Sequence, residues 1–150
     1  MKTFNVRVYG ILIHENQVLV SDEHIKGMNI TKLPGGGLEY GEGTIECVTR
    51  EFKEELNLDI EVESHFYTTD FFVNSAFSSN NQVISIYYLV KAKSDFEFTI
   101  ASQPFDFPTK KDGAQSMRWV DLAKISENDF TFIIDKRIGD MLNNNWKNLF

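Results

Sequence analysis

Cysteine, proline and long apolar runs are all scarce in this 150-residue sequence. The single cysteine, Cys47, excludes an intramolecular disulfide and any metal site built from several thiolates. No segment approaches the roughly 18 apolar residues that a membrane-spanning helix needs. The first residues also lack the long apolar segment of a secretory signal. We therefore expect a soluble, cytoplasmic protein.

Positively charged residues are also few. The sequence has 15 Lys and Arg residues but 22 Asp and Glu residues, which gives a net charge of -7. An acidic surface gains little from counterion release on nucleic acid and is repelled by anionic lipid, so neither a nucleic-acid duplex nor a membrane is an expected partner. A content of 42% hydrophobic and 25% charged residues is ordinary for a globular protein. The length predicts a single domain over residues 1–150.

Local patterning predicts a mixed α/β fold of the α+β kind. Strands are expected at residues 6–13, 17–20, 59–63, 65–67, 83–90 and 116–120, with a short strand end at 96–98. The apolar strand at 83–90 is expected to be central in its sheet. Helices are expected at 45–56 and, with an interruption, at 133–146. Segments 21–31, 32–43 and 102–113 are expected to be loops.

The helix at 45–56 follows a glycine-rich loop and has two distinct faces. We expect Thr44 to be its N-cap and Asn57 to end it, since Asn tolerates the left-handed conformation found there. One face is an apolar stripe with spacings of three and four residues, formed by Ile45, Val48, Phe52 and Leu56. The stripe predicts that the helix packs one side into the core.

Three carboxylates, Glu51, Glu54 and Glu55, fall within an arc of about 100° on another face of this helix. Like charges at such spacings destabilise a helix, so folding alone gives no reason to gather them. Binding of a divalent cation such as Mg²⁺ would explain the cluster, because such a cation prefers oxygen ligands. Glycine at Gly35 and Gly36 would let backbone groups approach the ion or a phosphate. The alternative is a solvated acidic face beside a structural turn.

Two residues of the helix have expected structural roles. Arg50 can reach Glu46 one turn back, or Glu42 in the loop, and either contact would hold the loop against the helix. Cys47 is expected to be a small buried residue, since no base is placed beside it by the sequence.

The segment Gly36 to Leu58 resembles the Nudix box. That pattern is Gly, five variable residues, Glu, seven variable residues, and then Arg-Glu-apolar-any-Glu-Glu-any-Gly-apolar. The matching positions here are Gly36, Glu42, Arg50, Glu51, Phe52, Glu54, Glu55 and Leu58. The only departure is Asn57 in place of the final Gly, and Asn is the next-best residue for a left-handed cap.

The resemblance implies a mixed β-sheet sandwiched between α-helices, and hydrolysis of a nucleoside diphosphate linked to another group with Mg²⁺ or Mn²⁺. By this resemblance Glu51 and Glu55 are metal ligands. Glu54 is a third ligand, or it binds through water and helps to activate the nucleophile. The carbonyl of Gly35 completes the metal shell. The resemblance assigns Arg50 to the catalytic site together with these three glutamates. It also implies that Arg50 forms an ion pair with Glu42 that stabilises the conformation of the Nudix box.

The substrate expected from the resemblance is a nucleoside triphosphate or a modified nucleotide. Members that act on ADP-ribose often carry a proline beyond the box where Asn74 stands here. ADP-ribose or sugar-nucleotide pyrophosphatase activity remains the alternative. A non-catalytic nucleotide-binding module is the alternative of a different class. The resemblance leaves a homodimer open.

Arg7 and Lys32 are candidate phosphate contacts, together with the backbone of Gly36 and Gly37. Arg7 on its strand can equally face solvent, so its role stays open. An extra catalytic carboxylate from later in the chain has three candidates, each of which can also be a plain surface acid: Glu97, Asp106 and Asp112.

Overall fold

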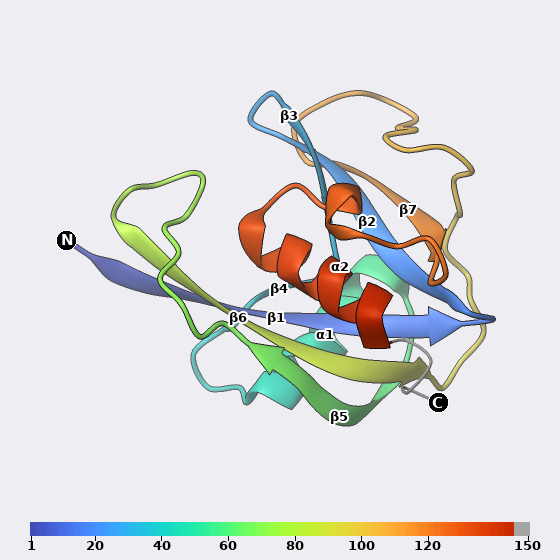
Figure 1. The fold of residues 1–150 in the computed structure, drawn as a ribbon, viewed down its shortest axis with the longest axis horizontal. Coiled ribbons are helices and arrows are strands. Elements are labelled where there is room, and N and C mark those ends of the chain that lie inside the picture. The colour runs from blue at the N-terminus through green and yellow to red at the C-terminus, as the bar shows by residue number, and fades with distance from the viewer. Residues whose placement is uncertain (146–150) are drawn as a thin grey trace. The chain divides into compact units, whose positions relative to one another are not determined.

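The computed structural model describes residues 1–145, with side chains through residue 144. Its elements are, in chain order, β1 (Thr3–His14), β2 (Gln17–Ile25), β3 (Met28–Lys32), β4 (Gly35–Gly37), α1 (Thr44–Leu56), β5 (Ile60–Thr68), β6 (Asn81–Ala92), β7 (Ala114–Asp121), the 3-10 helix η1 (Glu127–Asp129) and α2 (Ile133–Asn145) (Figure 1). Mixed strand pairing with two α-helices confirms the predicted α+β class. Within the described residues the chain forms two compact units, one from residues 1–12 and 34–97, the other from 13–33 and 98–145.

The first unit is built on β1, β4, β5 and β6. Strand β6 lies between β1, which it pairs in parallel, and β5, which it pairs antiparallel (Figure 1). The prediction of a central strand at 83–90 is therefore confirmed. Strand β4 pairs antiparallel with the other edge of β1, where Arg7 lies opposite Gly37 and Tyr9 opposite Gly35. The expected loop at 32–43 thus contains a short strand.

Helix α1 packs on this sheet through its apolar face. Val48, Phe52 and Leu56 are buried, as predicted. The ring of Phe52 lies against β1 at Gly10, where an added Cβ would be 2.5 Å from a ring carbon. Ile45 departs from the predicted stripe, because its first-turn position leaves the side chain 53% exposed.

The ends of α1 were predicted with mixed success. Asn57 adopts the expected left-handed conformation, with φ 49° and ψ 39°, and its N–H donates to the carbonyl of Lys53. The N-cap is Gly43 and not Thr44, which is the first helical residue. The hydroxyl of Thr44 instead lies 2.6 Å from that of Tyr88 on β6 and ties the helix start to the sheet.

The second unit is an antiparallel sheet in which β2 lies between β3 and β7. The end of β1 turns tightly into β2, which confirms the predicted return of the second strand beside the first. The expected loop at 21–31 is wrong, since β2 runs to Ile25 and β3 begins at Met28. The turn between them has positive φ at Lys26 and Gly27.

Two further expectations need correction. Residues 96–98 form no strand in the described chain. Helix α2 runs without interruption from Ile133 to Asn145. Gly139 within it lies against Ser126 and Phe130, where an added Cβ would be 2.6 Å from the Ser126 carbonyl oxygen. The last residue of the expected helix, Trp146, lies outside the described residues.

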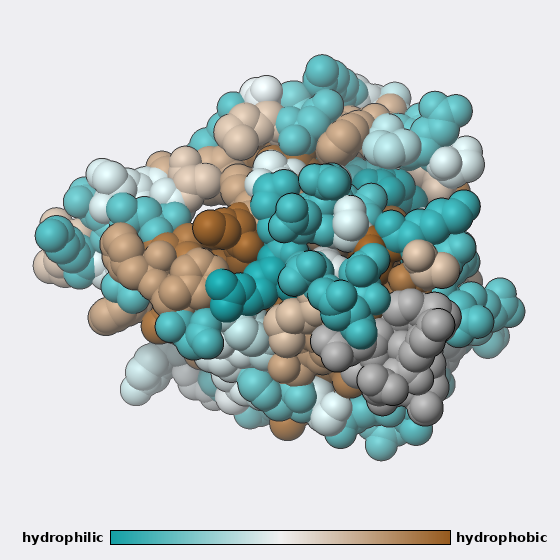
Figure 2. All heavy atoms as spheres, in the orientation of Figure 1, coloured by the Kyte–Doolittle hydropathy of each residue, from teal (hydrophilic) through white to brown (hydrophobic). Residues whose placement is uncertain are grey.

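Most large apolar side chains of the described residues are buried, and most of the exceptions lie in the first unit. Figure 2 shows hydrophobic residues at the left of the view, where β1 and β6 begin. Large apolar side chains exposed in this part of the chain include Phe4 on β1 and Phe72 in the segment between β5 and β6, each at 67%. Neither helix within residues 1–145 combines the length and the apolar content that crossing a membrane requires.

Candidate functional site

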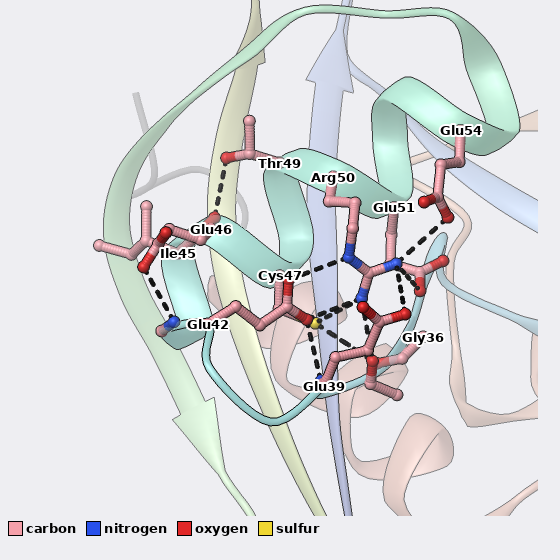
Figure 3. A network of polar contacts seen from close by, with 12 residues as sticks. Gly36, Glu39, Glu42, Ile45, Glu46, Cys47, Thr49, Arg50, Glu51 and Glu54 are labelled. Atoms are coloured by element: carbon pink, nitrogen blue, oxygen red, sulfur yellow. Dashed lines mark hydrogen bonds and ion pairs between the residues drawn. The ribbon is translucent and has the colours of Figure 1, made fainter.

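The loop between β4 and α1 is held to the helix by Arg50 (Figure 3). The Nε and Nη2 atoms of Arg50 donate to the two carboxylate oxygens of Glu42 at 2.9 and 2.7 Å. Nη2 also donates to the carbonyl of Gly37 at 3.1 Å. Of the two partners predicted for Arg50, the structure therefore shows Glu42. Glu46 instead accepts the backbone N–H of Gly43 at 2.9 Å.

The other edge of the guanidinium faces three more carboxylates. Nη1 of Arg50 lies 2.9 Å from Glu51, 3.1 Å from Glu54 and 3.7 Å from Glu39 (Figure 3). One positive charge is thus surrounded by four negative charges, counting Glu42. The cluster keeps a net negative charge that Arg50 alone does not neutralise.

Hydrogen bonding keeps the Arg50–Glu42 pair charged. Bonds from the Arg50 guanidinium, followed by the backbone N–H of Glu39, lower the pKa of Glu42 to about 2. The same contact with Glu42 raises the pKa of Arg50 above its ordinary value. Two parallel N–H···O bonds give such a pair a defined geometry. The pair therefore fixes the loop on α1 throughout the neutral range.

Cys47 lies beneath this pair and is fully buried, which confirms the role expected for it. Its thiol donates to the carbonyl of Gly37 at 3.5 Å. Burial, followed by the contact with the Glu42 carboxylate, raises the pKa of Cys47 to about 12. The thiol is therefore protonated at neutral pH and is not a nucleophile there.

We expect Cys47 to resist alkylation in the native protein. A thiol with a pKa of about 12 is ionised in roughly one molecule in ten thousand at pH 8, and the burial of Cys47 blocks reagent access as well. Iodoacetamide treatment followed by intact-mass measurement should show no adduct in buffer and a single adduct in denaturant. Rapid labelling of folded protein would contradict the described packing of the loop on α1.

Glycine allows the backbone of the loop to lie against the Glu51 carboxylate. An added Cβ at Gly36 would be 2.6 Å from that carboxyl group. Gly35 has φ +149°, and a Cβ there would be 2.1 Å from the carbonyl oxygen of Val8. Only residues without a side chain fit at these two positions. The structure thus brings the predicted residues Gly35, Gly36 and Glu51 together.

The donor chemistry of the cluster suits a hard divalent cation, because carboxylates and a glycine backbone supply oxygen ligands. Glu51, Glu54 and the half-buried Glu55 all lie on α1, next to the loop. Among the described residues, however, no three His, Cys, Asp or Glu side chains converge in the way that holding a metal requires. Two of the predicted ligands, Glu51 and Glu54, are bound to Arg50 instead.

Comparison with known proteins places the chain in a family. The family model described as NUDIX domain matches residues 3–138. The chain belongs to the Nudix family. This membership confirms the resemblance carried by Gly36 to Leu58 and the prediction of a Nudix-type hydrolase.

Solved structures of other Nudix proteins have the same fold. A NUDIX hydrolase from Nitrosomonas europaea has 22% identity and a TM-score of 0.66, and the match covers 99% of this chain and 73% of that one. A MutT protein from Methanosarcina mazei has 18% identity and a TM-score of 0.68, with 97% and 96% covered. An ADP-ribose pyrophosphatase from Streptococcus suis has 18% identity and a TM-score of 0.60, with 92% and 86% covered. At these identities the likeness establishes the fold.

Arg7, a candidate phosphate contact, does not lie beside Glu51. Neighbouring residues of a strand point to opposite faces, and Gly36 and Gly37 are neighbours on β4. The Cβ position of Gly36 points at Glu51, whereas that of Gly37 is 3.8 Å from Nη1 of Arg7. Arg7 also donates through Nε to the hydroxyl of Tyr9 at 2.6 Å. Arg7 and the Nudix-box carboxylates therefore occupy opposite faces of the sheet.

Lys32, the second candidate phosphate contact, forms a buried ion pair in the other unit. Its Nζ atom lies 3.0 Å from the carboxylate of Glu23, and the two side chains are only 10% and 12% exposed. Glu23 also accepts from the hydroxyl of Ser21 and the amide of Gln115. The sequence showed no sign of this cluster, because its members lie on strands predicted as a loop or far apart in the chain.

Two of the candidate extra carboxylates have partners within their own units. Glu97 accepts from the side-chain amide of Asn57 at 2.6 Å. Asp112 accepts from the backbone N–H of Lys26 at 2.7 Å. Glu39, by contrast, was not assigned to the site from the sequence, although it faces Arg50. Glu39 occupies one of the five variable positions of the Nudix box, so the motif did not indicate that it lies near Arg50.

Proposed function

We propose that this Nudix protein, acting as a single domain over residues 1–150, hydrolyses the pyrophosphate linkage of a nucleoside diphosphate joined to another group. A divalent ion, Mg²⁺ or Mn²⁺, would be held by Glu51, Glu54 and Glu55, with the backbone carbonyl of Gly35 as a further ligand. The proposed substrate is a nucleoside triphosphate or a modified nucleotide. A homodimer is compatible with this proposal.

The charge around Arg50 is the observation that carries the proposal. Four carboxylates, from Glu39, Glu42, Glu51 and Glu54, lie within 3.7 Å of a single guanidinium. Such an excess of negative charge repels an anionic substrate unless a cation lies between them. Bound cations supply that charge and lower the pKa of a coordinated water. The acidic cluster and the anionic substrate are therefore compatible.

The side chains of the Nudix box have different proposed roles in hydrolysis. Glu51, only 14% exposed, is oriented by Arg50 and by the backbone at Gly36. Glu54 is 59% exposed, so its carboxylate can meet solvent and accept a proton from the attacking water. The pair of Glu42 and Arg50 holds the loop in place and does not itself react.

Substrate contacts are proposed from the sequence together with these positions. The backbone of Gly36 and Gly37 would lie along the phosphates. Arg7 would contact a part of the substrate on its own face of the sheet. Lys32 would have to leave Glu23 before its ammonium could bind a phosphate. ADP-ribose is the second candidate substrate, because one similar structure is that of an ADP-ribose pyrophosphatase.

A hydrolysis screen tests the proposed function. The purified protein is incubated with Mg²⁺ or Mn²⁺ and with nucleoside triphosphates, modified nucleotides, ADP-ribose, sugar nucleotides or dinucleoside polyphosphates. We expect turnover of at least one nucleoside triphosphate or modified nucleotide, abolished by a chelator. Turnover of ADP-ribose alone would transfer the assignment to the second candidate. No turnover of any compound, with nucleotide binding retained, would favour a non-catalytic binding module.

A further inference from the structure

The Arg50 guanidinium has two edges with different partners. Its Nε and Nη2 atoms form a two-point contact with Glu42, at 2.9 and 2.7 Å. Its Nη1 atom bridges Glu51 and Glu54, at 2.9 and 3.1 Å. The first edge thus holds a loop residue, whereas the second holds two of the residues proposed above as metal ligands.

The two edges also differ in how firmly their partners are anchored. Glu42 is 14% exposed and accepts the backbone N–H of Glu39 at 2.9 Å in addition to the two bonds from Arg50. Of the two carboxylates bonded to Nη1, Glu51 is 14% exposed like Glu42, whereas Glu54 is 59% exposed and lies one turn beyond Arg50 on the same helix. A bidentate, anchored contact is harder to exchange than a single bond to an exposed carboxylate. Any rearrangement should therefore begin at the bond between Nη1 and Glu54.

We propose that the Nη1 edge of Arg50 is an internal counterion, which a divalent cation displaces from Glu51 and Glu54 while the edge bound to Glu42 stays in place. This inference rests on the proposed function, because it concerns the same carboxylates. It explains why no three ligands converge in the described residues while the donor set suits a metal. Arg50 then has two roles, since it braces the loop through Glu42 and competes with the metal through Nη1.

Competition has a measurable consequence for metal affinity. The cation must replace two charge-assisted hydrogen bonds, so the native protein should bind it more weakly than the carboxylates alone would allow. Arg50→Gln removes the competitor and one positive charge. Lys53→Gln is the matched control, because it removes one positive charge from the same helix at a side chain that pairs with Asp59. The comparison between the two variants corrects for the loss of one positive charge from α1.

The test measures the Kd for MnCl₂ by isothermal titration calorimetry on the native chain and on both variants. We expect Arg50→Gln to lower the Kd about tenfold relative to Lys53→Gln, equivalent to about 1.4 kcal/mol. An equal or higher Kd for Arg50→Gln, with native circular dichroism, would overturn the inference and support a purely bracing Arg50. If the native chain hydrolyses nucleotides and binds Mn²⁺, that outcome leaves the proposed function intact. Absence of Mn²⁺ binding by the native chain would overturn both.

A second measurement does not depend on the folding of any variant. In the native protein labelled with ¹⁵N-arginine, addition of MgCl₂ should change the Nη1 signals of Arg50. The Nε–H signal, bonded to Glu42, should keep its position. Arg50 Nη1 signals that stay unchanged at saturating Mg²⁺ would show that the guanidinium keeps Glu51 and Glu54, and would overturn the inference.

Discussion

Replacing Glu55 with glutamine is expected to reduce metal-dependent hydrolysis by at least about 10²-fold, because the change removes the charge of a proposed metal ligand. Glu55 is half-buried on α1, one helical turn after Glu51. Glutamine has almost the same size, so packing is retained while the negative charge is lost. The Kd for the metal and the kcat/KM with the best substrate of the screen are the quantities to measure, the latter over a range of Mg²⁺ concentrations.

The matched control is Glu63→Gln, which makes the same chemical change at an exposed position on β5. This variant should keep native kcat/KM, and both variants should keep the native unfolding midpoint. Near-normal turnover by Glu55→Gln would contradict the proposed role of the Nudix-box carboxylates. A large loss of stability in that variant would instead assign Glu55 a structural role.

The candidate site was predictable because its determinants are local. All of its carboxylates fall within the 23 residues from Gly36 to Leu58. The order of apolar and acidic residues on one helix sets which side is buried, and the left-handed Asn57 ends that helix. The structure adds what spacing cannot give, namely that one guanidinium contacts Glu42, Glu51 and Glu54 together.

Strand β4 was missed because glycine is a poor strand former in isolation. Gly35, Gly36 and Gly37 predicted a break in regular structure, yet they pair with β1. Glycine is required at Gly35 and Gly36 because neighbouring atoms leave no space for a Cβ, as the 2.1 Å between a Cβ at Gly35 and the Val8 carbonyl oxygen shows. Only the tertiary contacts reveal that requirement.

The polar residues at 21–24 were predicted as a loop for a similar reason. Strand β2 continues through them because their partners come from distant parts of the chain. Asp22 pairs with Arg118, which lies 96 residues later, and the amide of Gln115 reaches Glu23 across 92 residues. A single sequence gives no indication of such pairs. Alternating hydrophobicity, the usual signal of a strand, is absent because buried polar contacts replace it.

Removing the carboxylate of Asp22 is expected to lower the free energy of unfolding by about 3–5 kcal/mol. The side chain is fully buried and accepts from Arg118 Nε at 2.7 Å and from the Thr31 hydroxyl at 2.6 Å. It also accepts from the backbone N–H of Phe105 at 3.2 Å, which ties the segment between β6 and β7 to the sheet. Asp22→Ala leaves the largely buried guanidinium of Arg118 and the backbone N–H of Phe105 without the acceptor that Asp22 supplies. Urea unfolding monitored by circular dichroism measures the loss.

A double-mutant cycle separates the ion pair from the other contacts of Asp22. Arg118→Met added to Asp22→Ala removes the orphaned charge and replaces it with a long, unbranched apolar side chain. Because an unpaired buried charge is worse than no charge, the double variant should be more stable than Asp22→Ala alone. Additive losses would contradict this. They would mean that the stability of the sheet rests on the hydrogen bonds of Asp22 with Thr31 and Phe105 and not on its charge.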